Sequence, residues 1–300
     1  MSDPEKVAND FFVYLQRELM DGNPYLSEEE QGQLRSHYPM AMAPEHYPTG
    51  LIATVYSTRR AYPTRAILES ENPLVFDAGC GYGSDSFLFA AAGAKVMAAD
   101  LSRDQINIAE KRKRYYEENL NRPLDVTFRT ADLNEYRPES AEISVTWLSS
   151  VLAIIENQDV ILRRIYQATR PGGKVMIVDY NLWNPYILWI EWRRRRQALH
   201  KSPEFARHAD FWAMVSRKNR TGARFFPYLE SGFFDDVQFF TPKTLSRLLE
   251  RVGFRVLPHG FSGFAPPVLF KGLSVSAEKV FSHVPVLKSL GRAYVVTGVK

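Results

Sequence analysis

Three alternating glycines after a short apolar segment constrain the fold of this chain more than any other feature. The apolar segment is PLVFDA (73–78), the glycines are Gly79, Gly81 and Gly83, and a predicted helix follows over 84–92. A strand, a glycine-rich turn and a helix together form a cradle for a ligand at a helix N-terminus. Glycine suits the turn because larger side chains would block the ligand or clash. The sequence therefore predicts a ligand-binding turn here.

The glycine spacing argues against two common phosphate-binding turns. A dinucleotide site requires G-x-G-x-x-G, but Ser84 or Ser86 stands where its third glycine would be. The phosphate loop G-x-x-x-x-G-K-[ST] is absent as well. Asp77, two residues before the first glycine, would repel a pyrophosphate. A nicotinamide-dependent oxidoreductase is therefore a disfavoured alternative.

Strands and helices alternate along much of the chain. Such alternation predicts a parallel sheet with right-handed crossovers. We therefore expect an α/β fold with a doubly wound, mostly parallel, seven-stranded sheet. The predicted strands cover 73–78, 94–100, 125–130, 142–147, 174–180, 254–260 and 293–300. The predicted helices cover 7–19, 51–69, 84–92, a segment from 102, 158–170 and 242–252.

This pattern divides the chain into four regions. Residues 1–70 form an N-terminal helical cap, within which 36–50 (SHYPMAMAPEHYPTG) is expected to be an ordered loop. Residues 71–180 form the ligand-binding core of the sheet. Residues 181–238 interrupt the alternation and are expected to form an inserted helical lid or substrate segment. Residues 239–300 complete the sheet.

Four motifs within residues 73–180 resemble those of class I S-adenosylmethionine-dependent methyltransferases. DAGCGYG (77–83) fills the family pattern D/E-x-G-x-G-x-G. Asp100 ends the second predicted strand, Asp132 follows the third, and RPGGKVMIVDY (170–180) matches the turn into the fifth strand. The resemblance implies a Rossmann-like methyltransferase fold that binds S-adenosylmethionine (SAM).

The same resemblance implies roles for residues around the turn. Asp100 would accept hydrogen bonds from both ribose hydroxyls, because charge-assisted hydrogen bonds are the stronger kind. Asp132 would accept from the adenine amino group while the Leu133 amide donates to a ring nitrogen. Asp77 would place the amino-acid end of the cofactor. The other residues expected at the cofactor are Gly79, Cys80 (through its backbone), Gly81, Gly83, Leu101, Gln105 and Trp147, the last of which could equally be a core residue.

Methyl transfer from a sulfonium is an in-line displacement, for which an enzyme mainly supplies proximity and alignment. A hydroxyl acceptor usually also needs a general base, whereas an amine needs only a neutral lone pair. His46 and His37 are the candidate bases before the first strand, and Tyr180 is a candidate at the end of the fifth. Each could instead be a packing residue. The acids and histidines do not stand at clear metal-ligand spacings, so no metal is predicted.

The acceptor is less constrained than the cofactor. The fourth strand ends in TWLSS (146–150) rather than in the N/D-P-P-Y motif of nucleic-acid and glutamine N-methyltransferases, so nucleic acid is not expected. The C-terminal half loosely resembles bacterial small-molecule methyltransferases, which implies a natural-product, lipid or glycan acceptor. We expect O- or N-methylation of such a molecule. The alternatives are C-methylation of a lipid-like or anionic substrate, and a non-catalytic protein that keeps the cofactor cleft.

A basic segment lies in the predicted insertion. Residues 193–224 hold ten Lys or Arg and two acids, a net of +8, in a chain whose net charge is +4. Arginine with interleaved Trp and Phe suits a lid over an anionic or amphiphilic substrate, or a helix on a membrane surface through 186–224. A plain solvated surface is the third interpretation. The single cysteine, Cys80, and the lack of a long apolar stretch predict a cytoplasmic protein, with or without peripheral membrane contact.

Overall fold

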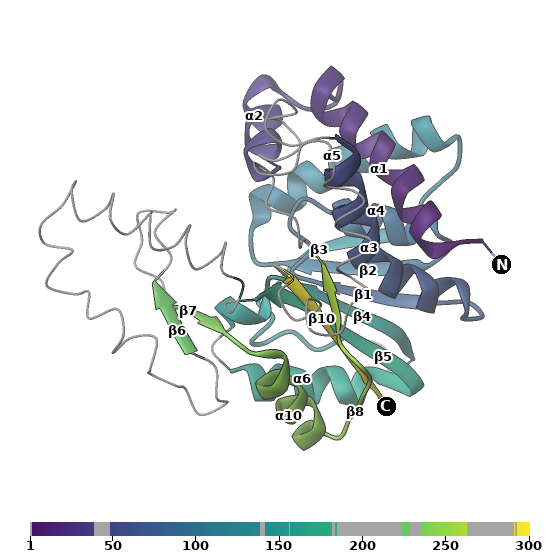
Figure 1. Ribbon diagram of the computed structural model, residues 1–300. Coiled ribbons are helices and arrows are strands. Elements are labelled where there is room, and N and C mark those ends of the chain that lie inside the picture. The colour runs from purple at the N-terminus through teal and green to yellow at the C-terminus, as the bar shows by residue number, and fades with distance from the viewer. Residues whose placement is uncertain are drawn as a thin grey trace, which may run out of the picture.

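The computed structural model describes residues 2–38, 49–138, 142–155, 157–181, 184, 224–227, 236–262, 291 and 293–300. Within these residues a central sheet is flanked by helices on both faces (Figure 1), which confirms the predicted α/β class.

The sheet runs in the order β3-β2-β1-β4-β5-β10-β8, and β9 pairs with β10 beside β8. Strands β1 to β5 pair in parallel, whereas β10 is antiparallel to its neighbours β5, β8 and β9. A mostly parallel sheet with seven strand positions is therefore present, as predicted. The strands are β1 Leu74–Ala78, β2 Lys95–Asp100, β3 Val126–Thr130, β4 Ile143–Ser149, β5 Thr169–Tyr180, β8 Arg255–Val256, β9 Gly260–Ser262 and β10 Ala293–Val299.

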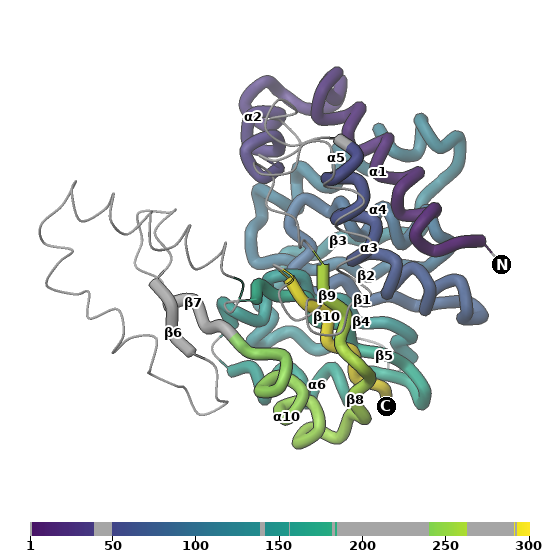
Figure 2. Tube along the Cα trace, in the orientation of Figure 1, coloured from purple at the N-terminus to yellow at the C-terminus, as the bar shows by residue number. Residues whose placement is uncertain are grey.

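The sequence predicted one strand over 254–260 at the seventh position of the sheet, and the structure differs there. Two short strands, β8 and β9, lie there along β10 (Figure 2). Pro258 stands between them and has no backbone N–H to offer a ladder. At Gly260 a Cβ atom would come within 2.1 Å of the Tyr62 hydroxyl oxygen. This residue can therefore enter β9 against helix α3 (Thr49–Leu68) only as glycine.

The fifth strand is longer than the predicted segment 174–180. Helix α6 ends at Ala168, two residues before the predicted end, and β5 then starts at Thr169. The Pro-Gly-Gly sequence lies inside the strand, where Gly172 has φ +75° and the register against β4 shifts. The glycines therefore form an irregularity within the strand rather than a turn before it.

Two layers of helices cover the two faces of the sheet (Figure 1). Helices of the N-terminal cap lie on the same face as α4 and α5, and residues from all of them share one apolar core. Helices α6 and α10 pack on the opposite face, over a second apolar core. The helices are α1 Pro4–Asp21, α2 Glu28–His37, α3 Thr49–Leu68, α4 Ser84–Ala91, α5 Arg103–Leu120, α6 Gln158–Ala168 and α10 Pro242–Val252, with a short 3₁₀ turn at Leu152–Ile154.

Helix α2 was not predicted, although its start has a clear local cause. Ser27 caps the helix by accepting from the Glu30 amide, and the Glu30 carboxylate accepts from the Ser27 amide. The helix includes residues 36 and 37, which were predicted to be loop, because it ends at His37. Residues 39–48 of the predicted loop lie outside the described part of the chain.

The described part of the insertion is a two-stranded antiparallel sheet. Strand β6 (Arg224–Pro227) pairs with β7 (Asp236–Phe239). Where the structure describes it, the segment predicted to be a helical lid is therefore extended. Apart from Asn181 and Asn184, the rest of the predicted lid, including the arginines at 193–196, lies outside the described residues.

Candidate functional site

The glycine loop lies at the carboxyl end of β1, directly beside the end of β2. The Gly79 and Cys80 amides both donate to the Ala99 carbonyl oxygen, at 2.8 and 3.1 Å. The Gly83 amide donates to the Cys80 carbonyl oxygen at 2.9 Å. The loop is therefore tied both to its neighbouring strand and to itself before helix α4 begins.

Each glycine of the loop has a positive φ, of +78°, +53° and +77° at Gly79, Gly81 and Gly83. A Cβ on Gly79 would come within 2.2 Å of a Val151 methyl, and one on Gly83 within 2.8 Å of the Phe128 ring. These two glycines are therefore needed for packing as well as for conformation. At Gly81 the nearest atom of the described residues is Gln105 Oε1, 3.4 Å from the added Cβ. Within the described part of the chain, Gly81 is therefore the glycine of the loop with the most room beside it.

Asp100, at the end of β2, binds the loop directly. One carboxylate oxygen accepts from the Gly81 amide at 2.8 Å and the other from the Ser102 amide at 2.9 Å. Each oxygen keeps a further lone pair that a hydroxyl could use. Asp100 is half-buried, and Leu101 beside it is 69% exposed. A partly accessible carboxylate next to an open glycine fits the predicted ribose site.

Asp132 lies at the end of the neighbouring strand β3. The Ala131 amide donates to the Asp100 carbonyl oxygen at 2.8 Å, which places the two strand ends side by side. The Asp132 carboxylate accepts from the Asn134 amide at 2.8 Å and so holds the turn that follows. The sheet thus brings Gly81, Asp100 and Asp132 to one edge, and their individual roles toward a cofactor stay predictions.

A cluster of acids lies beneath the loop. Asp77 is only 2% exposed, and its carboxylate accepts from the Ser86 hydroxyl at 2.5 Å. Burial, followed by the negative charge of Asp85, raises the pKa of Asp77 to about 8. Asp85 is itself paired with Arg60 of α3 at 2.5 Å. A cation bound beside Asp77, such as the amino group that the cofactor would bring, would favour the ionised form of this carboxyl.

Burial limits the role that the side chains of Trp147 and Cys80, both predicted at the cofactor, can have there. Trp147 is 1% exposed, and its indole N–H donates to the Asp85 carboxylate at 2.8 Å. This places its side chain in the core below the loop, so a direct cofactor contact has no support. Burial, and next the charge of Asp77, raise the pKa of the Cys80 thiol well above its usual value. A protonated thiol is a poor nucleophile, which agrees with a backbone role.

The candidate bases occupy different places. His37 ends α2 and packs edge-on against Tyr38 and against Tyr82 of the glycine loop. Desolvation, and next the positive charge of Arg112, lower the pKa of His37, which favours the neutral ring. Tyr180 is 46% exposed at the end of β5, and among the described residues no bond or ring contact joins it to His37. His46 lies outside the described residues.

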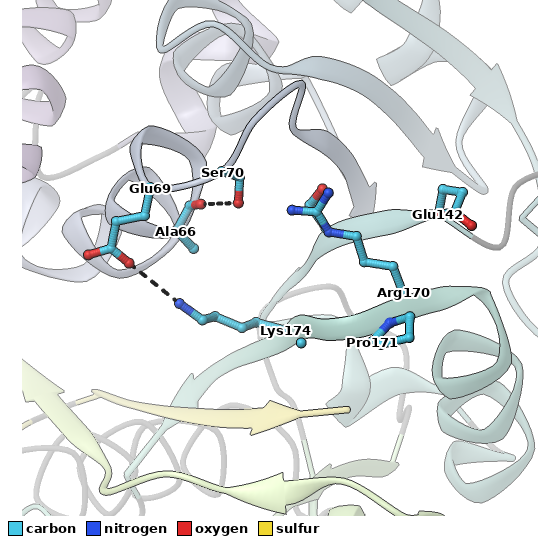
Figure 3. Close-up of a pocket in the computed structure, with 9 residues that line it drawn as sticks. Ala66, Glu69, Ser70, Glu142, Arg170, Pro171 and Lys174 are labelled. Carbon is cyan, nitrogen blue, oxygen red and sulfur yellow. Dashed lines mark hydrogen bonds and ion pairs between the residues drawn. The ribbon is translucent and has the colours of Figure 1, made fainter.

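Two surface pockets lie at the opposite edge of the sheet, at the amino ends of its strands. One of about 560 Å³ is lined by the end of α3 and the amino ends of β4 and β5, and across it Lys174 points at Glu69, with N and O 3.7 Å apart (Figure 3). A larger neighbour, of about 990 Å³, shares Glu142 and Arg170 with it. Both are far along the strands from the glycine loop, so neither is the predicted cofactor site.

Four charged residues near the loop were not found from the sequence: Glu18, Arg60, Asp85 and Arg112. Asp85 stands in the helix that follows the glycines, which could have suggested it. The other three come from helices whose positions relative to the loop no local pattern reveals.

Within the described ranges, no cluster of three or more His, Cys, Asp or Glu side chains could hold a metal ion. No helix in those ranges combines the length and the apolar character needed to cross a membrane.

Comparison with known proteins identifies the fold of this site. A solved SAM-dependent methyltransferase of Methanosarcina mazei covers 80% of the chain with a TM-score of 0.52 and 17% identity, and the match spans 97% of that structure. A SAM-dependent methyltransferase structure from Listeria monocytogenes gives a TM-score of 0.50 at 16% identity, and that match covers 80% of the chain and 96% of the structure. At these identities the likeness concerns the fold alone.

Similar sequences are methyltransferases with several kinds of acceptor. Phosphoethanolamine N-methyltransferase 3 of Arabidopsis thaliana is 30% identical over 107 residues, which is 35% of the chain and 21% of that protein. The cypemycin N-terminal methyltransferase of a Streptomyces species is 32% identical over 119 residues, 37% of the chain and 45% of that protein. A sterol 4-C-methyltransferase of Caenorhabditis elegans is 24% identical over 211 residues, 65% of the chain and 62% of that protein. In each case less than two thirds of the relative is matched.

A family model described as a methyltransferase domain matches residues 58–259, which is more than half of the chain. The match includes the glycine loop, Asp100, Asp132 and β5. The chain therefore belongs to the family of proteins with a methyltransferase domain.

Proposed function

We propose that the chain methylates a hydroxyl or amine of a small molecule that binds at the carboxyl edge of β4 and β5. The observation that carries this is the position of Tyr180, whose exposed side chain ends β5. Ser149 and Ser150 end β4 at the same edge and are not buried. Strand β4 pairs directly with β1, which carries the glycine loop. An acceptor at this edge would therefore lie next to the cofactor.

The cofactor supplies an electrophilic methyl group, and the residues of this chain bind and orient it. Asp100 and the open side of Gly81 would hold the ribose, and Asp132 the adenine. The buried Asp77 would hold the amino-acid end. For a hydroxyl acceptor, the neutral ring of His37, or Tyr180 in its phenolate form, would take the proton. For an amine acceptor, alignment at the strand edge would suffice.

The names of the relatives support small acceptors without choosing among them. Two relatives are named for N-methylation, of phosphoethanolamine and of the cypemycin N-terminus. The relative with the longest of the three overlaps is named for C-methylation of a sterol. We therefore keep N- or O-methylation first and C-methylation of a lipid-like acceptor second.

The basic segment is proposed to meet an anionic or amphiphilic acceptor, with a membrane surface as the other outcome. Replacing Arg193, Arg194 and Arg196 with Gln separates the two. A lid predicts a raised KM for the acceptor with unchanged SAM affinity. A membrane face predicts weaker, salt-dependent binding to anionic vesicles. If neither changes, the segment is only a charged surface.

A product assay tests the proposed function. The chain is incubated with SAM labelled in its methyl group and with separate pools of amines, phenols, glycans and lipids including sterols. We expect labelled product from at least one amine or hydroxyl pool. Label only in the lipid pool, on carbon, would favour the second candidate. SAM binding without product from any pool would favour the non-catalytic alternative.

The variant Tyr180→Phe tests the role of Tyr180 as a base. Its turnover should be about 10²-fold slower than that of the parent for a hydroxyl acceptor, and unchanged for an amine acceptor.

A further inference from the structure

Arg112 of α5 is a fully buried charge that the roles proposed above do not use. A buried charge is tolerated only when it is paired and hydrogen-bonded. Its Nε donates to Glu18 Oε1 at 2.9 Å and its Nη2 donates to Glu18 Oε2 at 2.6 Å. Two parallel hydrogen bonds thus join α5 to helix α1 of the N-terminal cap.

The remaining end of the guanidinium reaches the glycine loop. Arg112 Nη1 donates to the carbonyl oxygen of Tyr82, the residue between Gly81 and Gly83. The same nitrogen donates to the Ser84 hydroxyl at 3.0 Å, and Ser84 is the first residue of α4. One side chain therefore connects α1 to the back of the loop.

The Glu18 carboxylate makes further hydrogen bonds besides those with Arg112. It also accepts from the Tyr116 hydroxyl and from the Asn23 side-chain amide, both at 2.7 Å. Burial alone would raise the pKa of Glu18, but the charge of Arg112 and these hydrogen bonds keep it below its usual value. Glu18 is therefore ionised, which fixes the direction in which Arg112 points.

The second cap helix reaches the same place. The Tyr38 hydroxyl, directly after α2, donates to the Ser84 hydroxyl oxygen at 2.6 Å. His37 packs on the Tyr82 ring. The ends of α1 and α2 thus both reach Tyr82 and Ser84, α1 through the pair of Glu18 and Arg112 and α2 through His37 and Tyr38. These two residues flank Gly83, which has a positive φ. The contacts at Tyr82 and Ser84 therefore help to hold the backbone of Gly83 in this conformation.

We propose that Arg112, held by Glu18, is a positioning residue for the SAM site, so that helix α1 is a working part of that site. Arg112 restrains the peptide between Gly81 and Gly83 from behind, while Asp100 restrains it from the ligand side through the Gly81 amide. Losing the rear restraint lets the loop leave the geometry that the cofactor requires. This inference rests on the placement of SAM at the glycine loop.

Arg112→Lys, Glu18→Gln and Ser84→Ala test the proposal. Lys cannot bridge Glu18 and Tyr82 with a planar fork, and Ser84→Ala removes a loop contact without leaving a buried charge unpaired. We expect SAM affinity, measured by calorimetry, to fall about tenfold in Arg112→Lys and Glu18→Gln, and less in Ser84→Ala. The KM for SAM should rise with kcat at saturating SAM within about twofold. Amide exchange at residues 81–84 should accelerate relative to the amides of β4.

Matched controls separate positioning from general stability. Arg114→Lys and Glu118→Gln alter an exposed ion pair on the same helix, and Leu249→Ala destabilises the opposite core. These variants should keep SAM affinity within about twofold. The proposal is overturned if Arg112→Lys and Glu18→Gln bind SAM as tightly as the parent, or if Leu249→Ala weakens binding equally. A parent chain that does not bind SAM at all would instead overturn the proposed function, and this inference with it.

Discussion

At the scale of single residues, the site depends on carboxylates in unequal surroundings. Asp100 is half-buried, and its carboxylate accepts from the amides of Gly81 and Ser102, so it can accept from a ligand without first being taken out of water. Asp77 is almost fully buried among other acids, and its pKa is raised to about 8. Asp100 is therefore suited to neutral hydroxyls, whereas Asp77 would become ionised more readily if a cation were bound beside it.

Asp100→Ala should weaken SAM binding at least tenfold, because charged hydrogen bonds contribute ~1.5–3 kcal/mol each. The variant should also loosen the loop, since the Gly81 amide loses its acceptor. Calorimetry gives the affinity, and the exposed neighbour Asp104→Ala is the control. Equal SAM affinity in both variants would show that the ribose is not at Asp100.

Asp77 should make the stability of the ligand-free chain depend on pH. Its folded pKa, about 8, lies above the unfolded value near 4, so the folded state binds more protons between these limits. Its contribution to the free energy of unfolding should therefore fall as pH rises from about 4 to about 8. The measurement is urea unfolding at several pH values for the parent and Asp77→Asn. A difference between them that does not change with pH would contradict the assignment.

At the scale of secondary-structure elements, the N-terminal cap is built into the main core rather than attached to it. Residues of α1 pack with α4, α5 and the sheet in one cluster. The ring of Phe12 in α1 packs at a tilt of 40° against the ring of Tyr56 in α3, with ring centroids 4.8 Å apart. The cap should therefore unfold together with the sheet.

Phe12→Ala should lower the free energy of unfolding by about 3–4 kcal/mol, because it opens a cavity in this shared core. The adjacent Val13 is half exposed, so Val13→Ala is the matched control and should change the free energy by less than about 0.5 kcal/mol. Urea titrations read by far-UV circular dichroism and by tryptophan fluorescence should coincide for the parent. An early, separate loss of helix signal would mean that the cap is an independent unit.

Local patterns predicted the elements that carry the glycine loop. The apolar run before Gly79 correctly placed β1, and the helix predicted from 102 agrees with α5, which Ser102 caps. Helix α2 was missed although Ser27 and Glu30 form a capping box, since the helix buries only Leu34 and so lacks a strong apolar period. The close packing of Gly260 in β9 against Tyr62 depends on a residue far away in the chain and could not be read locally.

At the scale of the whole molecule, the parallel sheet explains why distant residues form one site. Asp100 ends a strand, Gly81 and Asp132 follow strands, and parallel strands place their carboxyl ends at one edge. This much followed from the sequence. The pair of Glu18 and Arg112, 94 residues apart, depends on how the cap packs and had no sequence signal. The same holds for Trp147, whose burial beside Asp85 is a consequence of tertiary packing.

The central claim is that SAM binds at the carboxyl edge of this sheet, and a titration followed by amide NMR tests it most directly. SAM is added to the isotopically labelled chain, and shifts are mapped onto the sequence. The account predicts the largest changes at residues 79–84, 100–102 and 131–133, with little change around Glu69 and Lys174 at the opposite edge. No binding, or changes concentrated around Glu69 and Lys174, would contradict it.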